Sequence, residues 1–140
     1  FLPCGQGAQR PARIVNPQKR VGGLGYNGCP MGCSDQSYPC DREGDFLETK
    51  YPYVVHAELN AILNSTRGLQ GCSIYVSLFP CNECAKAIIQ SGITKVVYEQ
   101  DKYDGTQANA ASKRMFRDAG VQLKKMDRIV EVDVKVLSEA

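Results

Sequence analysis

The chain has 140 residues, a length that fits one domain able to bury on the order of two thirds of its unfolded surface. Its 17 Lys and Arg residues against 15 Asp and Glu residues give a net charge of +2, and both signs are scattered without a basic run. This balance argues against a partner that is nucleic acid or a membrane surface. No apolar stretch approaches the length of a bilayer span, and the first residues lack a signal-peptide pattern, so the sequence predicts a soluble, cytoplasmic protein.

The first half of the chain alternates between irregular stretches and short regular elements. Residues 20–28 have the pattern of a glycine-rich strand that runs into a turn, and the Pro, Gly, Ser and Asp content of residues 29–45 predicts a loop. Because long loops in compact domains are usually functional or mobile, residues 29–50 are a candidate for contact with a ligand or another subunit. Residues 54–68 have the apolar spacing of a helix that Gly68 would end.

The second half of the chain alternates between runs of β-branched residues and helical patterns that stop at glycines. The predicted elements are a buried strand at 72–79, a helix at 80–92 with Pro80 in its first turn, a buried strand at 95–99, a helix at 106–120 and a strand at 121–126. Such an alternation predicts a parallel three-strand unit with right-handed crossovers. Residues 128–137 alternate strictly between apolar and polar, as in an edge or interface strand.

The cysteines point to metal chemistry more than to disulfides. There are seven, at positions 4, 29, 33, 40, 72, 81 and 84. An odd count in a domain that has its own core favours reduced thiols and metal ligation in a reducing compartment. Cys81 and Cys84 share the first turn of a predicted helix, where their sulfurs lie on one face and the helix dipole favours thiolates. The alternative is a pair of buried apolar thiols.

His56 is the single histidine of the chain. A lone histidine beside Ala and Leu is more often a structural residue than a ligand. However, consecutive helices of a parallel βαβαβ layer begin at the same edge of the sheet, so His56 can meet Cys81 and Cys84. Zinc prefers tetrahedral nitrogen and sulfur ligands, and a catalytic site leaves the fourth position to water. We therefore predict a zinc site, with Glu58 beside the open position as the base that takes a proton from the water.

The strings HAE (56–58) and PCNEC (80–84) together form the signature of the zinc-dependent nucleobase deaminases. Within that superfamily the chain resembles the deoxycytidylate (dCMP) deaminases from about Ile14 to about Met126, on the strings GYNGCPMGCSD, TKYPYVVHAELNAIL, SLFPCNECAKAIIQSGI and DKY. The resemblance implies a single deaminase domain over residues 1–140. It also implies an α/β fold of the three-layer α/β/α cytidine deaminase-like type, around a mixed sheet of about five strands.

The resemblance further implies an activity and its regulation. Members of the family convert dCMP and water to dUMP and ammonia, which feeds thymidylate synthesis. They are commonly homo-oligomers, such as hexamers or dimers, that dCTP activates and dTTP inhibits. The implied partners are thus small nucleotides, with no nucleic acid and no membrane.

Site residues follow from the same resemblance. His56, Cys81 and Cys84 would bind Zn²⁺, and Glu58 would take the water's proton, protonate N3 of the cytosine and help the amine to leave after attack at C4. Asn27 corresponds to the loop asparagine that contacts the deoxyribose in this family. Since Asn before Gly is also a strong turn signal in any fold, a purely structural role for Asn27 stays open.

The remaining binding residues are the candidates for the 5′-phosphate and for nucleotide effectors. Arg67, Lys102 and Tyr103 are available for the phosphate, although basic side chains at helix ends and in loops are usually only solvated. The family's effector site forms around the GYNGCPMG loop near subunit contacts. The implied effector-binding residues are Tyr26, Asn27, Gly28 and Gly32.

The start of the chain departs from the family pattern. In the family a helix and a strand with a Val-Gly-Ala string come before the residues equivalent to Ile14. Here Pro11 removes a ladder donor, and Arg10 and Arg13 do not suit a buried strand, so we expect residues 1–13 to be a divergent or truncated start with a weakened first strand. Residues 127–140 are expected to be a C-terminal edge segment.

Several alternatives remain at this point. Cys29, Cys33 and Cys40, with Cys4, could form an all-cysteine second zinc site, although free loop thiols are favoured. The chain could instead deaminate another cytosine or adenine nucleoside or nucleotide, including an RNA adenosine, against which stands the absence of a basic stripe. A catalytically impaired zinc-binding subunit is opposed by the presence of Glu58 but is kept open by the altered start.

Overall fold

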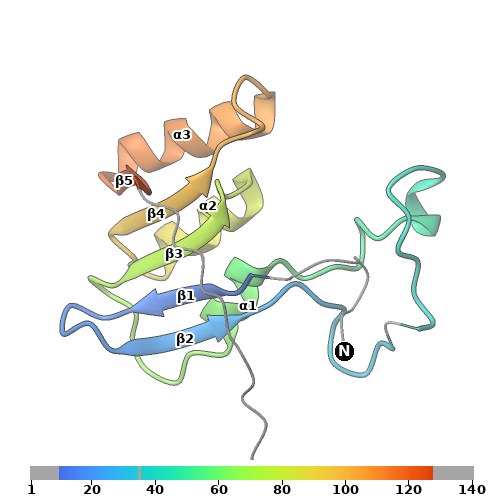
Figure 1. Cartoon of the computed structure of the whole chain (residues 1–140), viewed down its shortest axis with the longest axis horizontal. Helices are drawn as coiled ribbons and strands as arrows, with labels where there is room; N and C mark the ends of the chain where they lie inside the picture. Colours follow the sequence, from blue (N-terminus) through green and yellow to red (C-terminus); the bar gives the residue numbers. More distant parts are fainter. Residues whose placement is uncertain (1–9, 35, 128–140) are drawn as a thin grey trace, which may run out of the picture.

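The computed structural model describes residues 10–34 and 36–127 (Figure 1). Its elements in chain order are β1 (Ala12–Val15), β2 (Val21–Gly25), the short 3₁₀ helix η1 (Phe46–Glu48), α1 (Ala57–Leu63), β3 (Ser73–Leu78), α2 (Asn82–Gln90), β4 (Lys95–Gln100), α3 (Gln107–Ala119) and β5 (Gln122–Lys125). The predicted strand at 128–137 lies outside the described residues. None of the helices in the described part of the chain is long and apolar enough to cross a bilayer.

The five strands form one mixed sheet in the order β2-β1-β3-β4-β5. β1 is antiparallel to both of its neighbours, whereas β3, β4 and β5 run parallel to one another. The predicted parallel three-strand unit and the mixed sheet of about five strands are therefore confirmed. β3 is followed by α2 and β4 by α3, and both helices begin at the same edge of the sheet. The segments that connect these strands to their helices therefore lie close together at that edge.

The start of the sheet corrects the expectation of a weakened first strand. Ala12 and Ile14 are 2% and 0% exposed, and β1 pairs with a strand on each side. Arg13 alternates to the opposite face, where it is exposed. Pro11 lies just before the strand, so it removes no bond from the ladder. Pro11 and Arg13, two of the three residues that argued against a strand, thus occupy positions that tolerate them.

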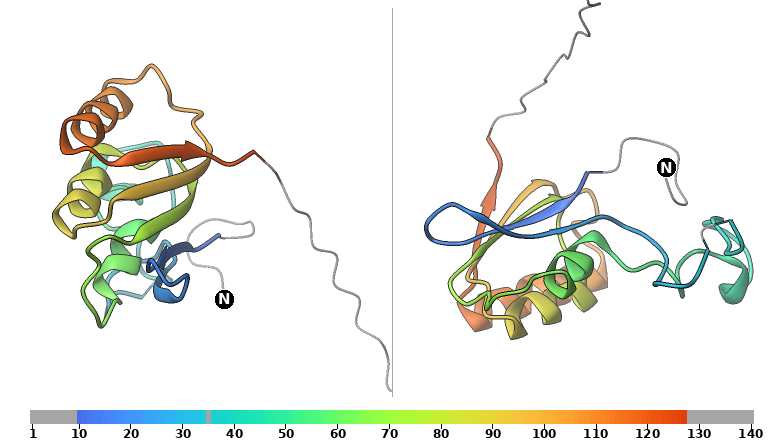
Figure 2. Two further views of the ribbon diagram at one scale, coloured as in Figure 1. Left: turned by 90° about the vertical axis from the view of Figure 1, so that its left-hand side faces the viewer. Right: turned by 90° about the horizontal axis from the view of Figure 1, so that it is seen from below.

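All three helices lie on one face of the sheet (Figure 2). The core fills the space between this helical layer and the sheet, and its fully buried members include Ile14, Ile74, Ile88, Val96 and Phe116. The second helical layer of the expected three-layer arrangement is not seen in residues 10–34 and 36–127. Within those ranges the fold is a mixed sheet covered on one side by helices.

α1 can lie directly on β2 because β2 is rich in glycine. A Cβ atom on Gly25 would lie 2.2 Å from the backbone nitrogen of Ala61 and 2.4 Å from the carbonyl oxygen of Ala57, and a Cβ on Gly23 would lie 2.6 Å from the carbonyl oxygen of Ala61. Real Cβ atoms do not approach backbone this closely, so only glycine fits at these two positions. The close contact determines where the first turn of α1 sits.

Two helix boundaries differ from the prediction. α1 ends at Leu63 rather than near Gly68, because Asn64 donates its side-chain amide to the carbonyl of Leu24 and the Ser65 hydroxyl donates to the carbonyl of Ala61. Such side-chain contacts with the backbone compete with helical hydrogen bonds. Pro80 lies before the N-cap of α2 rather than in its first turn.

The segment 29–50 projects from the main body (Figure 1). As predicted, it is mostly irregular, and η1 is its one short helix among the described residues. It returns to the body at a bridge in which Gly28 and Val55 exchange backbone hydrogen bonds of 3.1 and 2.8 Å. This bridge fixes the chain immediately before His56.

Candidate active site

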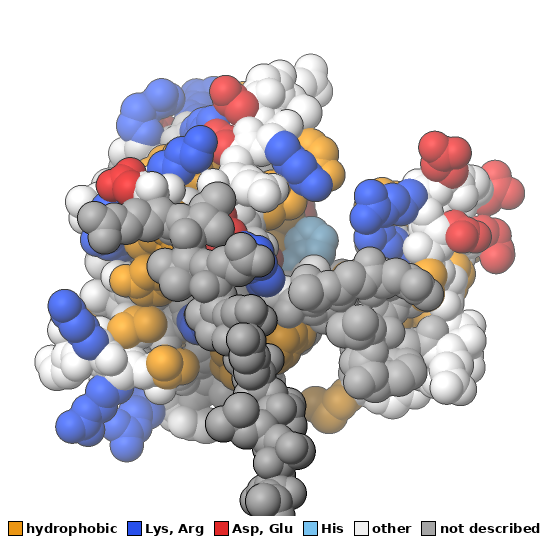
Figure 3. All heavy atoms as spheres, viewed as in Figure 1, with side chains coloured by type: hydrophobic (Ala, Val, Ile, Leu, Met, Phe, Trp, Pro, Cys, Tyr) orange, Lys and Arg blue, Asp and Glu red, His pale blue; other side chains and the backbone are white. Residues whose placement is uncertain are grey.

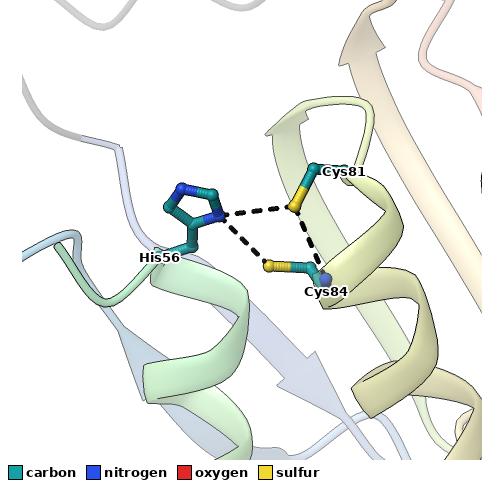
Figure 4. Close-up of side chains that lie close together, drawn as sticks. All are labelled: His56, Cys81 and Cys84. Carbon is teal, nitrogen blue, oxygen red and sulfur yellow. Dashed lines mark hydrogen bonds between the residues drawn. The ribbon is translucent and has the colours of Figure 1, made fainter. Parts of the chain in front are cut away.

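The starts of α1 and α2 meet beside the sheet and bring one imidazole and two sulfurs together (Figure 4). His56 is the N-cap residue of α1 and Cys81 is the N-cap residue of α2. Cys84 is the third residue of α2 and is buried. The three predicted ligands converge because α1, which follows β2 in the chain, and α2, which follows β3, begin at the same edge of the sheet.

The spacing of the three ligand atoms fits a tetrahedral metal. His56 Nδ1 lies 3.3 Å from Cys84 Sγ and 3.5 Å from Cys81 Sγ, and all three atoms lie within 4.8 Å of one another. A zinc ion with bonds of about 2.0 Å to nitrogen and about 2.3 Å to sulfur would set such atoms about 3.6 Å apart. One nitrogen and two sulfurs are also the donors that zinc prefers. In residues 10–34 and 36–127 no other group of three such side chains lies this close.

The charges of the three side chains depend on one another. The pKa of Cys81 is lowered to about 4, chiefly by the hydrogen bond from the Cys84 thiol and also by His56, so Cys81 is a thiolate. The hydrogen bond to Cys81 raises the pKa of His56. The pKa of Cys84 is raised, first by its bond to the Cys81 sulfur and then by burial and by Glu58. A bound dication favours both thiolates, so metal binding would release the proton of Cys84.

Glu58 lies next to the ligand group without belonging to it. It is the second residue of α1, and its Oε2 accepts a hydrogen bond from Cys84 Sγ at 3.6 Å. Burial raises the pKa of the Glu58 carboxyl. A carboxyl group in this position can exchange a proton with a molecule bound beside the metal ligands.

His56, Cys81 and Glu58 border a cavity of about 670 Å³. Four basic side chains also line it, namely Arg10 before β1, Arg42 and Lys50 in the segment 29–50, and Lys102 after β4. Burial, and then the nearby Arg42, lowers the pKa of Lys50. Figure 3 shows basic side chains on both sides of the hollow between the main body and the projecting segment, whereas acidic side chains gather at the far end of that segment. The cavity therefore suits an anionic ligand.

Comparisons with known proteins agree with this chemistry. A sequence model described as the cytidine and deoxycytidylate deaminase zinc-binding region matches residues 6–100. The deoxycytidylate deaminases of Mus musculus and Homo sapiens are each 51% identical to the chain over 120 residues, which cover 84% of this chain and 67% of each relative. The chain belongs to the cytidine and deoxycytidylate deaminase family. It is therefore a deaminase, a hydrolase, and Zn²⁺ is the cofactor that its His/Cys/Cys group fits.

A solved structure extends the family match to three dimensions. The dCMP deaminase of cyanophage S-TIM5, determined in complex with dCMP and dUMP, superposes on this chain with a TM-score of 0.61. The two sequences are 27% identical, and the match covers 82% of this chain and 79% of the phage chain. The expected cytidine deaminase-like α/β fold is thus confirmed.

Asn27 connects the GYNG loop of this deaminase to the start of α1, directly after the predicted ligand His56. Its side-chain oxygen accepts a 2.7 Å hydrogen bond from the backbone N–H of Ala57, the first residue of α1, and its side chain lines the cavity. The side-chain NH₂ group remains a donor for a ligand. The structural role of Asn27 and a ligand contact are therefore compatible with each other.

The other predicted binding residues separate into two groups. Lys102 and Tyr103 line the cavity and follow β4. Arg67 is exposed in the segment after α1 and is not among the residues that line the cavity. The structure therefore brings two of the three phosphate candidates to the active site.

The predicted effector residues lie along the route into the projecting segment. Tyr26 is exposed, and its carbonyl accepts a 2.6 Å hydrogen bond from the side chain of Asn60. Gly28 forms the bridge to Val55, and Gly32 has a positive φ of 85°. Apart from Asn27, none of these residues lines the active-site cavity.

The loop cysteines only partly match the prediction of free thiols. Cys33 is a free thiol, but Cys40 is disulfide-bonded, which corrects the expectation that it would be reduced. Spacing along a sequence does not show which sulfurs a fold brings to bonding distance. Cys29, Cys33 and Cys40 also form no metal-binding group with one another among the described residues.

Three basic residues of the cavity were missed by the sequence analysis. Arg10 was treated as part of a divergent start, and it forms an ion pair with Glu99 of β4. Arg42 and Lys50 lie in the segment 29–50, which its length had marked as a candidate for ligand contact, but no pattern distinguished them from solvated charges.

Proposed function

We propose that this chain catalyses the zinc-dependent hydrolytic deamination of dCMP to dUMP and ammonia. The observation that carries the proposal is a complete His56, Cys81 and Cys84 group with Glu58 beside it, in a cavity lined by basic side chains. The names of the similar mammalian enzymes and the dCMP complex of the phage enzyme support the same substrate.

In this proposal a bound zinc ion would act as a Lewis acid that makes a water molecule nucleophilic at neutral pH. Glu58 takes a proton from that water and delivers it to N3 of the cytosine. It then passes the second proton of the same water, left on the oxygen added at C4, to the departing amine, so that the reaction consumes one water and releases ammonia. Asn27 holds the start of α1 through its bond to Ala57, which keeps His56 and Glu58 in place.

The charge of the cavity favours a nucleotide over a nucleoside. Arg42, Lys50 and Lys102 line the cavity, and a phosphate is the part of dCMP that such cations bind most strongly. Arg10 also lines it, but Glu99 partly neutralises its charge. We therefore assign the 5′-phosphate to Lys102 with Tyr103, with Arg42 and Lys50 as further cationic contacts.

The test is a zinc-replete assay of ammonia release from dCMP, dCTP, deoxycytidine and cytosine side by side. We expect dCMP to have a higher kcat/KM than deoxycytidine or cytosine, because only a nucleotide can use the basic wall of the cavity. A higher value for deoxycytidine or cytosine would contradict the phosphate assignment. No release from any of the four by a fully zinc-loaded protein would contradict the proposed reaction.

We also infer that the enzyme is a homo-oligomer, a hexamer or a dimer, that dCTP activates and dTTP inhibits, and that its dUMP supplies thymidylate synthesis. The support is the family to which the chain belongs, together with the projecting segment 29–50, which contains Gly32 and directly follows Tyr26, Asn27 and Gly28 in the chain. The cytoplasmic location stays a prediction from the sequence.

A further inference from the structure

A compact group of polar side chains lies behind the loop between β4 and α3. We call it the Asp101 cluster; it consists of Asp101, Asp104, Asn109 and Lys113. The Asp101 carboxylate accepts a 2.7 Å hydrogen bond from the side-chain amide of Asn109 and a 2.6 Å bond from Lys113 Nζ. Lys113 also donates to Asp104 Oδ1 at 2.7 Å. Two side chains of α3 therefore hold both aspartates of the loop.

The hydrogen bond to Asp101 determines how the side-chain amide of Asn109 is oriented. Asn109 is 5% exposed, and its Oδ1 has no hydrogen-bond partner in the described part of the chain. A carboxylate can only accept, so the NH₂ group of Asn109 must face Asp101 and the oxygen must face away. Leaving a buried oxygen without a donor is costly. The fold nevertheless keeps this arrangement at the cavity, which Asn109 also lines.

Lys113 links the cluster to the segment that carries a metal ligand. Its ammonium lies 5.2 Å from the centre of the Phe79 ring, within the range of a cation–π contact. Phe79 is buried, packs edge-on against Tyr98 and Phe116, and comes two residues before Cys81. The cluster thus rests on the rigid core directly behind the active site.

The loop that the cluster holds carries residues of the cavity wall. Lys102, Tyr103 and Thr106 line the cavity, and the loop's own backbone bonds are local, from Asp104 N–H to the Asp101 carbonyl and from Thr106 N–H to the Tyr103 carbonyl. Local bonds define the shape of a loop but do not attach it to the body. The side-chain contacts of Asp101 supply that attachment.

We propose that Asp101, Asn109 and Lys113 are positioning residues that hold Lys102 and Tyr103 against the cavity for the phosphate of the substrate. The proposal rests on the proposed function for the identity of the ligand, but not for the attachment of the loop. The three residues act through Lys102 and do not touch the substrate's reacting atoms.

The test variant is Asp101→Asn, which keeps the shape of the side chain but removes its negative charge and one of the two acceptor oxygens that Asn109 and Lys113 use. The matched control is Asp118→Asn, the same chemical change at an exposed position on α3 outside the cavity. We expect Asp101→Asn to raise KM for dCMP about fivefold, with kcat within about twofold of the parent. Asp118→Asn should change neither.

A double-mutant cycle with Lys102→Ala distinguishes positioning from a general loss of stability. If Asp101 acts through Lys102, Asp101→Asn should add less than about twofold to KM once Lys102 is absent. A full additional fivefold effect in the Lys102→Ala background would overturn the proposal, as would an equal fall in kcat.

Hydrogen exchange tests the attachment independently of the reaction. In Asp101→Asn the amides of Asp104 and Thr106 should exchange at least about tenfold faster than in the parent, while amides of α1 and α2 keep their rates. Unchanged exchange at both loop amides would overturn the proposal even if the parent enzyme proved inactive on dCMP. Failure of the parent to turn over dCMP, with faster loop exchange in the variant, would contradict the proposed function alone.

Discussion

At the scale of single residues, the active site depends on two helix starts that each contribute the N-cap residue. His56 and Cys81 have extended backbones just before their helices, which turns their side chains toward each other, and Cys84 completes the group one turn into α2. Within this group Cys84 is the buried member. Its loss therefore cannot be compensated by water as easily as the loss of an exposed ligand.

We expect Cys84→Ser to bind less than about a tenth of the parent's zinc and to unfold at a lower temperature, because the free energy of metal binding is partly free energy of folding. Metal analysis of the purified protein and a thermal melt check both effects. Cys33→Ser, which removes a free thiol outside the ligand group, is the control and should keep full zinc content. Stoichiometric zinc in Cys84→Ser would refute the ligand assignment.

Glu58→Gln preserves the size of the side chain but removes its ability to accept a proton. We expect kcat for dCMP to fall at least about a hundredfold with zinc retained, as is typical when a general acid-base group is lost. Ammonia release and metal content are measured on the same preparation. Glu83→Gln, the same change at an exposed carboxylate of α2, should stay within about twofold of the parent. Near-parental turnover by Glu58→Gln would require a different base.

The residue scale also shows how far a sequence can predict a site. His56, Cys81 and Cys84 could be selected because zinc constrains both ligand type and spacing. Arg42 and Lys50 could not, because a basic side chain in an irregular segment has no pattern that distinguishes a cavity wall from solvent.

At the scale of secondary-structure elements, the close contact between α1 and β2 sets the position of the metal ligand on α1. We expect Gly25→Ala to destabilise the protein by about 2 to 3 kcal/mol, because the new methyl group would meet the backbone of Ala57 and Ala61 and α1 would have to move. Gly22→Ala is a matched control in the same strand, where the nearest atom to a new Cβ is the Ile14 carbonyl oxygen at 4.0 Å.

Chemical denaturation of both glycine variants measures the difference in free energy of unfolding. Zinc content and kcat should fall in Gly25→Ala and stay near the parent in Gly22→Ala, because only the first change displaces His56. Equal stability of the two variants would show that α1 can shift on β2 without cost.

Element by element, the parallel half of the sheet was predictable and the antiparallel half was less so. The strands β3 and β4 were predicted from runs of β-branched residues, and the end of α3 was predicted from Gly120, which adopts a positive φ of 74° in the structure. The sequence around β1 argued against a strand, because Arg13, the polar residue of β1, faces away from the helices. The end of α1 was missed because a tertiary contact of Asn64 with Leu24 and a local bond of Ser65 to Ala61 decide it.

At the scale of the whole molecule, the segment 29–50 and the residues that follow it present large apolar side chains to solvent. Met31 is fully exposed, and Phe46, Leu47 and Tyr51 are 67%, 64% and 57% exposed. Exposed apolar groups that cluster on one segment are typical of contact surfaces. The proposed homo-oligomer would cover them, and it would bring Tyr26 and Asn27, which precede the segment in the chain, close to a neighbouring subunit.

If nucleotide effectors bind near this segment, they can act on the active site through the Gly28–Val55 bridge, which directly precedes His56. An effector changes affinity only to the extent that it favours one subunit arrangement over another. We therefore expect dCTP to lower the dCMP concentration at half-saturation and dTTP to raise it, each by about fivefold or more. Linkage requires dCMP to tighten dCTP binding by the same factor.

Sedimentation and dCMP saturation curves, with and without each effector, check assembly and regulation together. Phe46→Ser with Leu47→Ser should shift the sedimentation coefficient toward the monomer and weaken the response to both nucleotides, because these side chains are exposed in the single chain and lie outside the cavity. Gln107→Ser, an exposed change on α3 away from the segment, is the control. A monomeric parent with a hyperbolic curve that neither nucleotide moves would contradict the proposed regulation, yet it would leave the zinc chemistry intact, because His56, Glu58 and both cysteine ligands come from one chain.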